Sequence, residues 1–532
     1  MCFLCLFVAA FRGRALEALS FHDRSFVRAA ADLSTLILRA DLKHKQLPFA
    51  ANVTGVSDSQ NSRWSRRGVN DVDGDANRQL AWTKQRLHHS RGCSLHQRDH
   101  SCSCEHCGKR VAVFVGNRTG EILWANYEFG GGGGANFQFR HVGVKITEYN
   151  PRMQSNYDVA VIGAGVFGVW TAYQLKQAGA SVLLLDGYGP GNSRASSGGE
   201  SRIMRLGYGP DEIYTRSAQR SLQAWEEFFA RCDSATPLFH RTGVLWLARE
   251  PDPYCEATLR NLLAVGARAE RLDQEDLRAQ FPQMKFDGVD WAVHESEAGV
   301  IMARRAVQAV ALKARANGVD YLEESIVAPI NGRDVRTTSG KEIVAKHIVF
   351  ACGPWLPKLF PDLLGERIHV TKQEIFFLGV PSGDLFKSPQ LPTWVDFNDL
   401  VYGMPALDGR GAKLAIDAHG PEFDPDRGDR IVSAESTKAV REYLARRLPM
   451  LADAPVTETR VCQYENTSNG DFLIDRHPAL ENVWLVGGGS GHGFKHGPAV
   501  GEYVTAMISG NGTAEPRFSL ATKEKVQERK VY

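Results

Sequence analysis

The sequence predicts an α/β fold with a largely parallel sheet, in which one domain is interrupted by a second domain of the α+β class. Three observations lead to this prediction. The apolar run 159–162 leads into a glycine turn and a segment with helical spacing, and a second apolar run ends at Asp186. Two further apolar runs, 347–353 and 482–487, return after long intervening segments. Continuous apolar runs are typical of parallel strands buried on both faces, and the long segments between them indicate an inserted domain.

The glycine turn has the spacing of a dinucleotide-binding fingerprint. Gly163 permits a tight turn, Gly165 lets a pyrophosphate approach the backbone, and Gly168 lets the next helix pack close to the strand. Asp186 stands 18 residues after Gly168, where an acid can accept hydrogen bonds from the adenosine ribose. The sequence therefore predicts a bound dinucleotide, and an α/β unit without a nucleotide is the alternative.

Length, charge and cysteine content exclude several classes of protein. A chain of 532 residues has room for two or three domains, and its net charge of +2 gives no reason to expect nucleic acid or a membrane surface as partner. No run reaches the ~18 apolar residues of a membrane-spanning helix. The first ten residues resemble a signal-peptide core, but Arg12 and Arg14 follow the apolar stretch instead of preceding it. The sparse cysteines after residue 110 suit a reducing compartment, so we expect a cytoplasmic protein, with secretion as the alternative.

Residues 1–152 differ in composition from the rest of the chain. The stretch 52–110 is rich in polar residues, and the glycine run 130–134 is typical of a flexible linker. We expect a low-complexity, disordered extension over 1–152, with Met153 as a natural start. One part of it crowds together residue types that bind metals: Cys93, His96, His100, Cys102, Cys104, His106 and Cys107. Their spacing fits no standard finger, so we expect no metal there, with zinc as the alternative.

From residue 153 onward the pattern is that of a globular protein. Helices are predicted over 212–230 and 303–317, and strands over 241–248, 319–323 and 342–345. We assign the nucleotide-binding part to about 155–205, 299–365 and 459–515, and the inserted substrate-binding part to about 206–298 and 366–458.

A second glycine-rich segment, 487–501, follows the last predicted strand and opens a helix that runs to about residue 509. Pro498 stands near the first turn of this helix, where a missing N–H costs little. A helix N-terminus offers unpaired N–H donors and a partial positive charge, which suit an anion. A reduced flavin carries negative charge around N1 and the C2 oxygen, so a flavin placed here is stabilised in its reduced state. The alternative is a glycine-rich loop that only packs two elements together.

At this point the chain resembles a known family, the flavin amine oxidases of the monomeric sarcosine oxidase and N-methyltryptophan oxidase type. They belong to the wider D-amino-acid-oxidase-like superfamily. The resemblance covers about 155–515 and depends on four segments in order, namely 157–186, 200–209, 461–467, and 472–478 taken with 489–495. It implies a Rossmann-like FAD-binding domain, interrupted by a substrate-binding α+β domain, with FAD as the cofactor.

The resemblance also implies which residues bind the cofactor. Cys462 stands where this family attaches its flavin through a cysteinyl thioether, whereas alone it would be an inert core thiol. The other expected cofactor-binding residues are Gly163, Gly165, Gly168, Asp186, Gly353, Gly491, Gly493, Phe494 and Lys495.

Five residues are implied in catalysis. Arg202 matches an arginine near the flavin, and Arg205 matches the arginine that pairs with the substrate carboxylate, for which a planar guanidinium is suited. Lys495 matches a second cation in that pocket. Tyr402 resembles an active-site tyrosine, and Lys413 resembles the lysine that faces the flavin and assists the reaction with oxygen. The alternatives are surface ion pairs for the arginines and a solvated side chain for Lys413.

Two positions depart from the family's pattern. Gly198 and Asp417 stand where sarcosine oxidases carry histidines, although His419 is close to the second position. Both changes touch the substrate pocket, so sarcosine itself is in doubt as the substrate while the flavin chemistry is unaffected.

The resemblance thus implies FAD-dependent oxidation of a secondary or N-methylated amino acid to an imine, with oxygen reduced to hydrogen peroxide. The expected partners are the small amino-acid substrate and oxygen, with no nucleic acid and no membrane, and the expected state is a monomer. The alternatives are a flavin dehydrogenase that passes electrons to a quinone or protein, an NAD-dependent dehydrogenase, and a non-catalytic flavoprotein.

Overall fold

The computed structural model describes residues 156–328, 330 and 335–527, together with five short strands before residue 150. The chain forms two compact units, Met1–Arg152 and Met153–Tyr532. In the first unit, β1 (Cys93–His96) pairs with β2 (Ser101–Cys104), and a three-stranded antiparallel sheet joins β3 (Val111–Gly116), β4 (Ile122–Tyr127) and β5 (Val142–Val144). The signal-like start and the side chains of the cysteine and histidine group lie outside the described residues.

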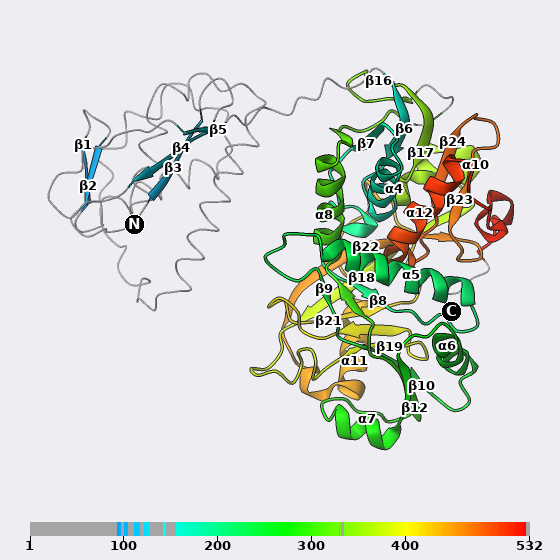
Figure 1. Cartoon of the computed structure of the whole chain (residues 1–532). Coiled ribbons are helices and arrows are strands. Elements are labelled where there is room, and N and C mark those ends of the chain that lie inside the picture. Colours follow the sequence, from blue (N-terminus) through cyan, green and yellow to red (C-terminus); the bar gives the residue numbers. More distant parts are fainter. Residues whose placement is uncertain are drawn as a thin grey trace. The chain divides into compact units, whose positions relative to one another are not determined.

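A six-stranded sheet forms the centre of one half of the second unit (Figure 1). In spatial order its strands are β14 (Asp320–Glu323), β7 (Val182–Asp186), β6 (Tyr157–Ile162), β17 (Ala345–Phe350), β24 (Val483–Gly487) and β23 (Leu473–Arg476). The first five are parallel, and β23 at the edge is antiparallel to β24. The side chains of β6, β7 and β24 are almost all buried. The prediction of a parallel sheet whose strands return after long insertions is therefore confirmed.

Three helices cover one face of this sheet, and α4 (Val166–Gln177) lies in contact with both α8 (Ala303–Ala316) and α12 (Gly497–Ile508). A fourth helix, α5 (Glu212–Phe229), packs Trp225 edge-on against Trp170 of α4, with ring centroids 5.0 Å apart. The same hydrophobic cluster continues into the second half of the unit through Trp246. Helix α5 therefore joins the two halves through a shared core.

An eight-stranded sheet forms the other half. In spatial order its strands are β11 (Ala269–Asp273), β12 (Trp291–Glu295), β10 (Val244–Ala248), β19 (Thr393–Asp396), β20 (Val401–Met404), β21 (Ala412–Ile416), β18 (Ile368–Leu378) and β22 (Val456–Thr467). Its strands pair antiparallel except for β10 with β19. One face packs Leu245 and Leu247 against helices α7 (Gln274–Gln280) and α11 (Ala434–Arg447). Trp246 lies on the opposite face, in the core shared with α5 and with α6 (Pro253–Ala264). A smaller sheet of β8 (Arg202–Met204), β13 (Gly299–Ile301) and β9 (Phe239–His240) lies between the two halves.

Several predicted boundaries differ from the structure. The strand predicted over 347–353 is β17, which ends at Phe350, and the one predicted over 342–345 is the shorter β16 (Glu342–Ile343). The strand predicted over 241–248 begins only at Val244, because Gly243 turns the chain with a positive φ of 69°. Strand β22 belongs to the eight-stranded sheet, although we assigned residues from 459 onward to the nucleotide-binding part. Its pairing with β18 over nearly its whole length places it there, and only its last residues reach the cofactor region.

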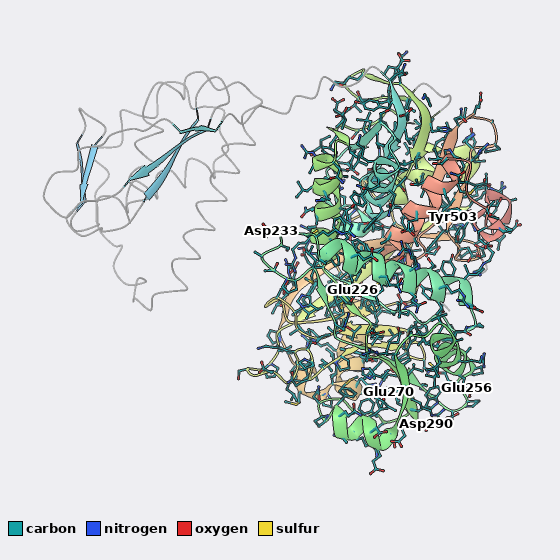
Figure 2. All side chains as sticks on the ribbon, viewed as in Figure 1. Glu226, Asp233, Glu256, Glu270, Asp290 and Tyr503 are labelled. Atoms are coloured by element: carbon teal, nitrogen blue, oxygen red, sulfur yellow. The ribbon has the colours of Figure 1, made fainter. Side chains whose placement is uncertain are left out.

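Charged side chains cover the outer surface of the second unit. Glu256 on α6, Glu270 on β11 and Asp290 before β12 are exposed and point away from the core (Figure 2). Among the helices that the structure describes, none combines the length and apolar character needed to cross a bilayer.

Expression from Met153 tests whether the first unit is dispensable. We expect the shortened chain to fold and to retain its yellow cofactor, because Met153–Tyr532 forms a compact unit of its own. The measurements are the thermal unfolding midpoint and the absorbance of bound flavin per protein, each against the full chain. Loss of folding or of bound FAD in the shortened chain would contradict the prediction.

Candidate active site

A cavity opens at the carboxyl ends of the parallel strands. Its wall includes the last residues of β6 and β7, the residues after β17, and the loop after β24. Ligands of open α/β sheets bind at this edge. The cavity is also lined by Cys462 of β22, so the eight-stranded sheet closes one side of it.

The glycine turn can accept no larger residue at two of its positions. Gly163 has a φ of 107°, and a Cβ there would lie 2.3 Å from the carbonyl oxygen of Ala351. A Cβ at Gly168 would lie 1.8 Å from the carbonyl oxygen of Gly163. A Cβ at Gly165 would meet only the Ser197 hydroxyl, at 3.5 Å, so this position faces open space. The turn therefore brings the N-terminus of α4 to the cavity with its backbone accessible, as a pyrophosphate requires.

Asp186 ends β7 at the opposite side of this turn. Its Oδ2 accepts a hydrogen bond from the Ala164 N–H at 2.7 Å, and its Oδ1 accepts one from the Tyr188 N–H at 2.8 Å. Burial raises the pKa of this carboxyl group. Each carboxylate oxygen can accept a second hydrogen bond, and Asp186 lines the cavity. The carboxyl group thus fits the ribose of a bound dinucleotide.

The structure places most of the expected cofactor residues around this cavity. Gly163, Gly165, Asp186, Gly353, Cys462, Gly491, Gly493 and Phe494 all line it. Gly168 lies beneath the turn instead, and Lys495 lines a neighbouring cavity. The accessible glycine backbone and the carboxyl group of Asp186 in this wall fit FAD.

Glu465 is a cavity residue that our sequence reasoning missed. It follows Tyr464 on β22, and its Oε1 accepts a hydrogen bond from the Gly489 N–H at 3.3 Å. Burial raises its pKa to about 7. The carboxyl group thereby connects the glycine-rich loop after β24 to the eight-stranded sheet. A carboxylate three residues after Cys462 on a buried strand was the available signal.

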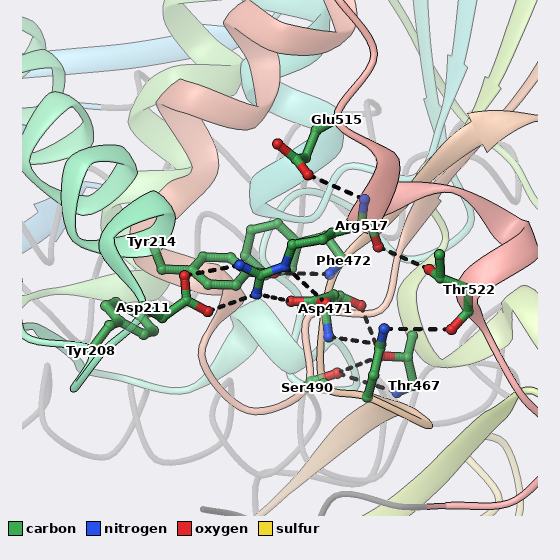
Figure 3. A network of polar contacts seen from close by, with 12 residues as sticks. Tyr208, Asp211, Tyr214, Thr467, Asp471, Phe472, Ser490, Glu515, Arg517 and Thr522 are labelled. Carbon is green, nitrogen blue, oxygen red and sulfur yellow. Dashed lines mark hydrogen bonds and ion pairs between the residues drawn. The ribbon is translucent and has the colours of Figure 1, made fainter. Parts of the chain in front are cut away.

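The C-terminal segment holds the same loop from the other side (Figure 3). Arg517, in the short helix η7 (Pro516–Phe518), donates at 2.6 Å to both Asp211 and Asp471. The Asp471 carbonyl accepts a hydrogen bond from the Thr467 hydroxyl at 2.7 Å, and the Thr467 N–H donates to the Ser490 hydroxyl at 3.2 Å. This network connects the start of α5 to the loop that contains Gly491.

A second, smaller cavity adjoins the first and shares Arg202, Cys462, Tyr464, Gly491 and Phe494 with it. It lies on the eight-stranded sheet, because residues of β18, β20 and β22 contribute to its wall. Among our predicted catalytic residues, Arg202, Arg205, Tyr402 and Lys495 line it. The structure therefore brings together residues that are far apart in the sequence.

Arg205 is held in a fixed position beside this second cavity. Its guanidinium carbon lies 4.3 Å from the ring centre of Tyr208 and 5.0 Å from that of Trp246. Glu295, only 1% exposed, accepts hydrogen bonds from the Leu206 N–H at 2.7 Å, the Gly207 N–H at 3.1 Å and the Trp246 indole N–H at 2.5 Å. Sequence reasoning missed Glu295, since nothing in the pattern of β12 marks it.

Lys495 approaches Arg205 from the glycine-rich end. Its Nζ donates to the Tyr208 hydroxyl and to the His492 carbonyl, both at 2.9 Å. The Tyr208 hydroxyl also lies 2.6 Å from Nε2 of His496, whose pKa is held well below its usual value by burial. His496 is therefore neutral, and the two cations Arg205 and Lys495 flank a single tyrosine. Such a pair can bind an anionic group of a ligand.

Arg202 contacts the cysteine. Its Nη2 lies 3.1 Å from Sγ of Cys462 and 2.5 Å from the Ser196 carbonyl oxygen, and its Nη1 donates to the Ser201 carbonyl at 2.8 Å. Cys462 itself is buried and opposite Gln373 in the pairing of β22 with β18. A positive charge therefore lies against the sulfur at the junction of the two cavities.

Lys413 lines neither cavity. Its Nζ donates to the Ser201 carbonyl at 2.9 Å and lies 5.7 Å from the ring centre of Tyr402. Burial, reinforced by the charge of Arg202, lowers its pKa well below that of an ordinary lysine. The side chain lies behind Ser201 and Arg202, buried in the protein and not solvated.

The two departures from the family pattern differ in their setting. A Cβ at Gly198 would lie 1.7 Å from the carbonyl oxygen of Asn192, so this backbone leaves no space for a side chain. Asp417, in contrast, lines the second cavity and accepts a hydrogen bond from the Tyr464 hydroxyl at 2.8 Å. His419 lines neither cavity.

Known proteins resemble this chain over most of the second unit. The chain is 32% identical over 376 residues to a monomeric sarcosine oxidase from Streptomyces avermitilis, covering 68% of this chain and 96% of the relative. It is 27% identical to an N-methyl-L-tryptophan oxidase from Salmonella heidelberg, covering 68% of this chain and 97% of that protein. Among solved structures, L-proline dehydrogenase from P. horikoshii shares the fold with a TM-score of 0.60 and 22% identity, covering 69% of this chain and 97% of that chain. Residues 158–507 match the family described as FAD dependent oxidoreductase, and the chain belongs to that family.

Proposed function

We propose that this protein oxidises a secondary or N-methylated amino acid to an imine, using FAD and reducing oxygen to hydrogen peroxide. The observation that carries the proposal is the pair of cations, Arg205 and Lys495, in a small cavity that shares a wall with the cofactor cavity. The relatives named as sarcosine oxidase and N-methyl-L-tryptophan oxidase support the same class of substrate. We also propose that the protein acts as a monomer.

The chain's residues orient the substrate. Arg205 and Lys495 bind its carboxylate, and the rings of Tyr208 and Trp246, which both contact the Arg205 guanidinium, keep it in place before the substrate arrives. The amine-bearing carbon then lies where the second cavity meets the cofactor cavity, beside Cys462 and Gly491, which line both. Fixed orientation of this kind removes much of the entropic barrier to reaction. The bound FAD supplies the redox chemistry, by accepting the equivalent of a hydride from the neutral amine.

The apolar lining of the second cavity restricts water. Ile203, Ile375, Val395, Phe397 and Met404 form much of its wall. A dry site strengthens the pairing of the cations with the substrate carboxylate. Hydrolysis of the imine yields an aldehyde or a keto acid.

The function is tested by mixing the protein with N-methylated amino acids in the absence of oxygen. We expect the flavin absorbance to bleach at a rate that saturates with substrate, and admission of air to restore it with release of hydrogen peroxide. Arg205→Ala should lower the second-order rate constant of bleaching. We expect the corresponding activation free energy to rise by about 1.5–3 kcal/mol, the scale of a hydrogen bond to a charged group. Arg249→Ala, which removes a partly exposed arginine paired with Asp399, is the matched control.

Failure of every N-methylated and secondary amino acid to bleach the flavin would overturn the proposal. Bleaching followed by slow reoxidation in air, but fast reoxidation by a quinone, would favour a dehydrogenase over an oxidase.

Cys462→Ser tests a covalent flavin, which we propose because the Cys462 sulfur lines both cavities beside Arg202. In the wild type we expect the yellow colour to stay with the protein pellet after acid precipitation. In the serine variant it should pass into the supernatant, since a hydroxyl forms no thioether. Cys352→Ser is the control, because Cys352 lines the same cavity at the end of β17. Colour that stays in the pellet of the Cys462 variant would exclude this attachment.

Lys413→Met tests the proposal that this buried cation assists the oxygen reaction by stabilising the negative charge that develops on oxygen. We expect reoxidation to slow far more than reduction by substrate. Because the pKa of Lys413 is lowered, its positive charge is present at low pH and is lost as the pH rises through that value. Wild-type reoxidation should therefore slow with rising pH, and the variant should lose this dependence. Lys372→Met, on neighbouring β18, is the control, and equal slowing of both half-reactions by Lys413→Met would argue against the role.

A further inference from the structure

The second cavity, which the proposed function makes the substrate cavity, has one carboxylate among the described residues that line it, namely that of Asp417. The other charged side chains in that wall are Arg202, Arg205 and Lys495. Arg202 already donates to the Ser196 and Ser201 carbonyls and contacts the Cys462 sulfur. The cavity therefore has a cationic part suited to a carboxylate and a separate acidic residue for which the proposed reaction has no use.

The backbone determines where Asp417 faces. It follows β21, and its N–H donates to the Leu400 carbonyl at 2.7 Å. Side chains alternate between the faces of a strand, so Asp417 faces the same side as Lys413, four residues earlier. That side of the sheet also includes Cys462, which packs with Ala415 in one small cluster. The backbone of Asp417, directly after the end of β21, is thus anchored to the residue that precedes β20.

A neighbouring tyrosine keeps the carboxylate oriented. The Tyr464 hydroxyl donates to Oδ1 of Asp417 at 2.8 Å. Burial raises the pKa of Tyr464 well above its usual value, so this phenol remains a neutral donor. Tyr464 lines both cavities and stands two residues after Cys462 on β22. Asp417 is therefore held in one position beside the place where the substrate meets the cofactor.

The charges of this wall indicate the kind of substrate. A carboxylate in a largely apolar cavity is costly unless a charged or donating group pairs with it. An amino acid bound through its carboxylate at Arg205 and Lys495 extends the rest of the molecule along the cavity wall. The Asp417 carboxylate would repel an acidic end of the ligand, whereas a cationic end would form a charge-assisted hydrogen bond with it.

We propose that Asp417 determines specificity by binding a second, positively charged group of the substrate, so that the preferred substrate is an N-methylated amino acid with a basic side chain. This inference depends on the proposed amine oxidation and adds the class of the side chain to it.

Matched pairs of substrates test the inference. Nα-methyl-ornithine is compared with Nα-methyl-norvaline, and Nα-methyl-lysine with Nα-methyl-norleucine, by anaerobic bleaching of the flavin. In at least one pair, we expect the wild type to oxidise the basic substrate with a second-order rate constant about 10- to 100-fold higher than that of its neutral partner. One hydrogen bond to a charged group provides a difference of this size. Asp417→Asn should remove most of this preference by slowing the basic substrate, while the neutral substrate changes little. Asp399→Asn, which alters a partly buried acid that pairs with Arg249 and Arg446 and lines neither cavity, is the control and should keep the preference.

A binding measurement without turnover gives a second readout. 5-Aminopentanoate and pentanoate lack an α-amine and cannot be oxidised, and their binding is followed by the shift of the flavin spectrum. We expect the wild type to bind the amino compound about 10- to 100-fold more tightly, and Asp417→Asn to bind the two about equally. Flavin content and thermal midpoint of the variant show whether it is folded.

The outcomes separate this inference from the proposed function. If none of the four N-methylated amino acids or any other bleaches the flavin, the proposed function fails and the specificity fails with it. If N-methylated amino acids are oxidised without preference for a basic side chain, or if Asp417→Asn keeps that preference, only the role of Asp417 is overturned. If the asparagine variant does not fold, equal binding of the two pentanoates by the wild type overturns the role on its own.

Discussion

The close approach of helix α4 to the parallel sheet is the constraint on which the cofactor site depends. A Cβ at Gly168 would lie 1.8 Å from the Gly163 carbonyl oxygen, and one at Gly163 would lie 2.3 Å from that of Ala351. Only glycine at both positions lets α4 begin directly at the end of β6 while β17 pairs beside it. The N-terminus of α4 then faces the cavity, and the Ala164 N–H of the same turn donates to Asp186. The nucleotide-binding geometry is thus a steric consequence of two residues without side chains.

Strand β22 connects this cofactor site to the substrate cavity. Cys462 and Tyr464 project from one face and belong to the walls of both cavities. Glu465, the next residue, projects to the other face and accepts a hydrogen bond from Gly489 in the loop after β24. The pairing of β22 with β18 and the hydrogen bond from Gly489 hold these three side chains in a fixed register. A single strand therefore contributes to the walls of both cavities and links them.

Buried polar contacts keep the cations of the substrate cavity in place. Glu295 accepts three hydrogen bonds from the loop after Arg205 and from Trp246, and Tyr208 lies between the side chains of Arg205 and Lys495. Two buried positive charges repel one another and lose hydration, so they are stable there only with such partners. In the proposed function, the carboxylate of an amino-acid substrate adds the negative charge that these two cations would bind.

Sequence reasoning alone identified the parallel sheet, the glycine turn, α5 and α8, because each depends on local spacing or on burial on both faces of a strand. It also placed Gly163, Gly165, Asp186 and the 487–501 segment at a nucleotide site, since the fingerprint is a local pattern. Only the tertiary structure decided that β22 lies in the eight-stranded sheet, that Lys413 is buried behind Arg202, and that Glu295 supports the loop after Arg205. Those features depend on contacts between residues far apart in the chain, such as the 89 positions between Leu206 and Glu295, and no local period records such contacts.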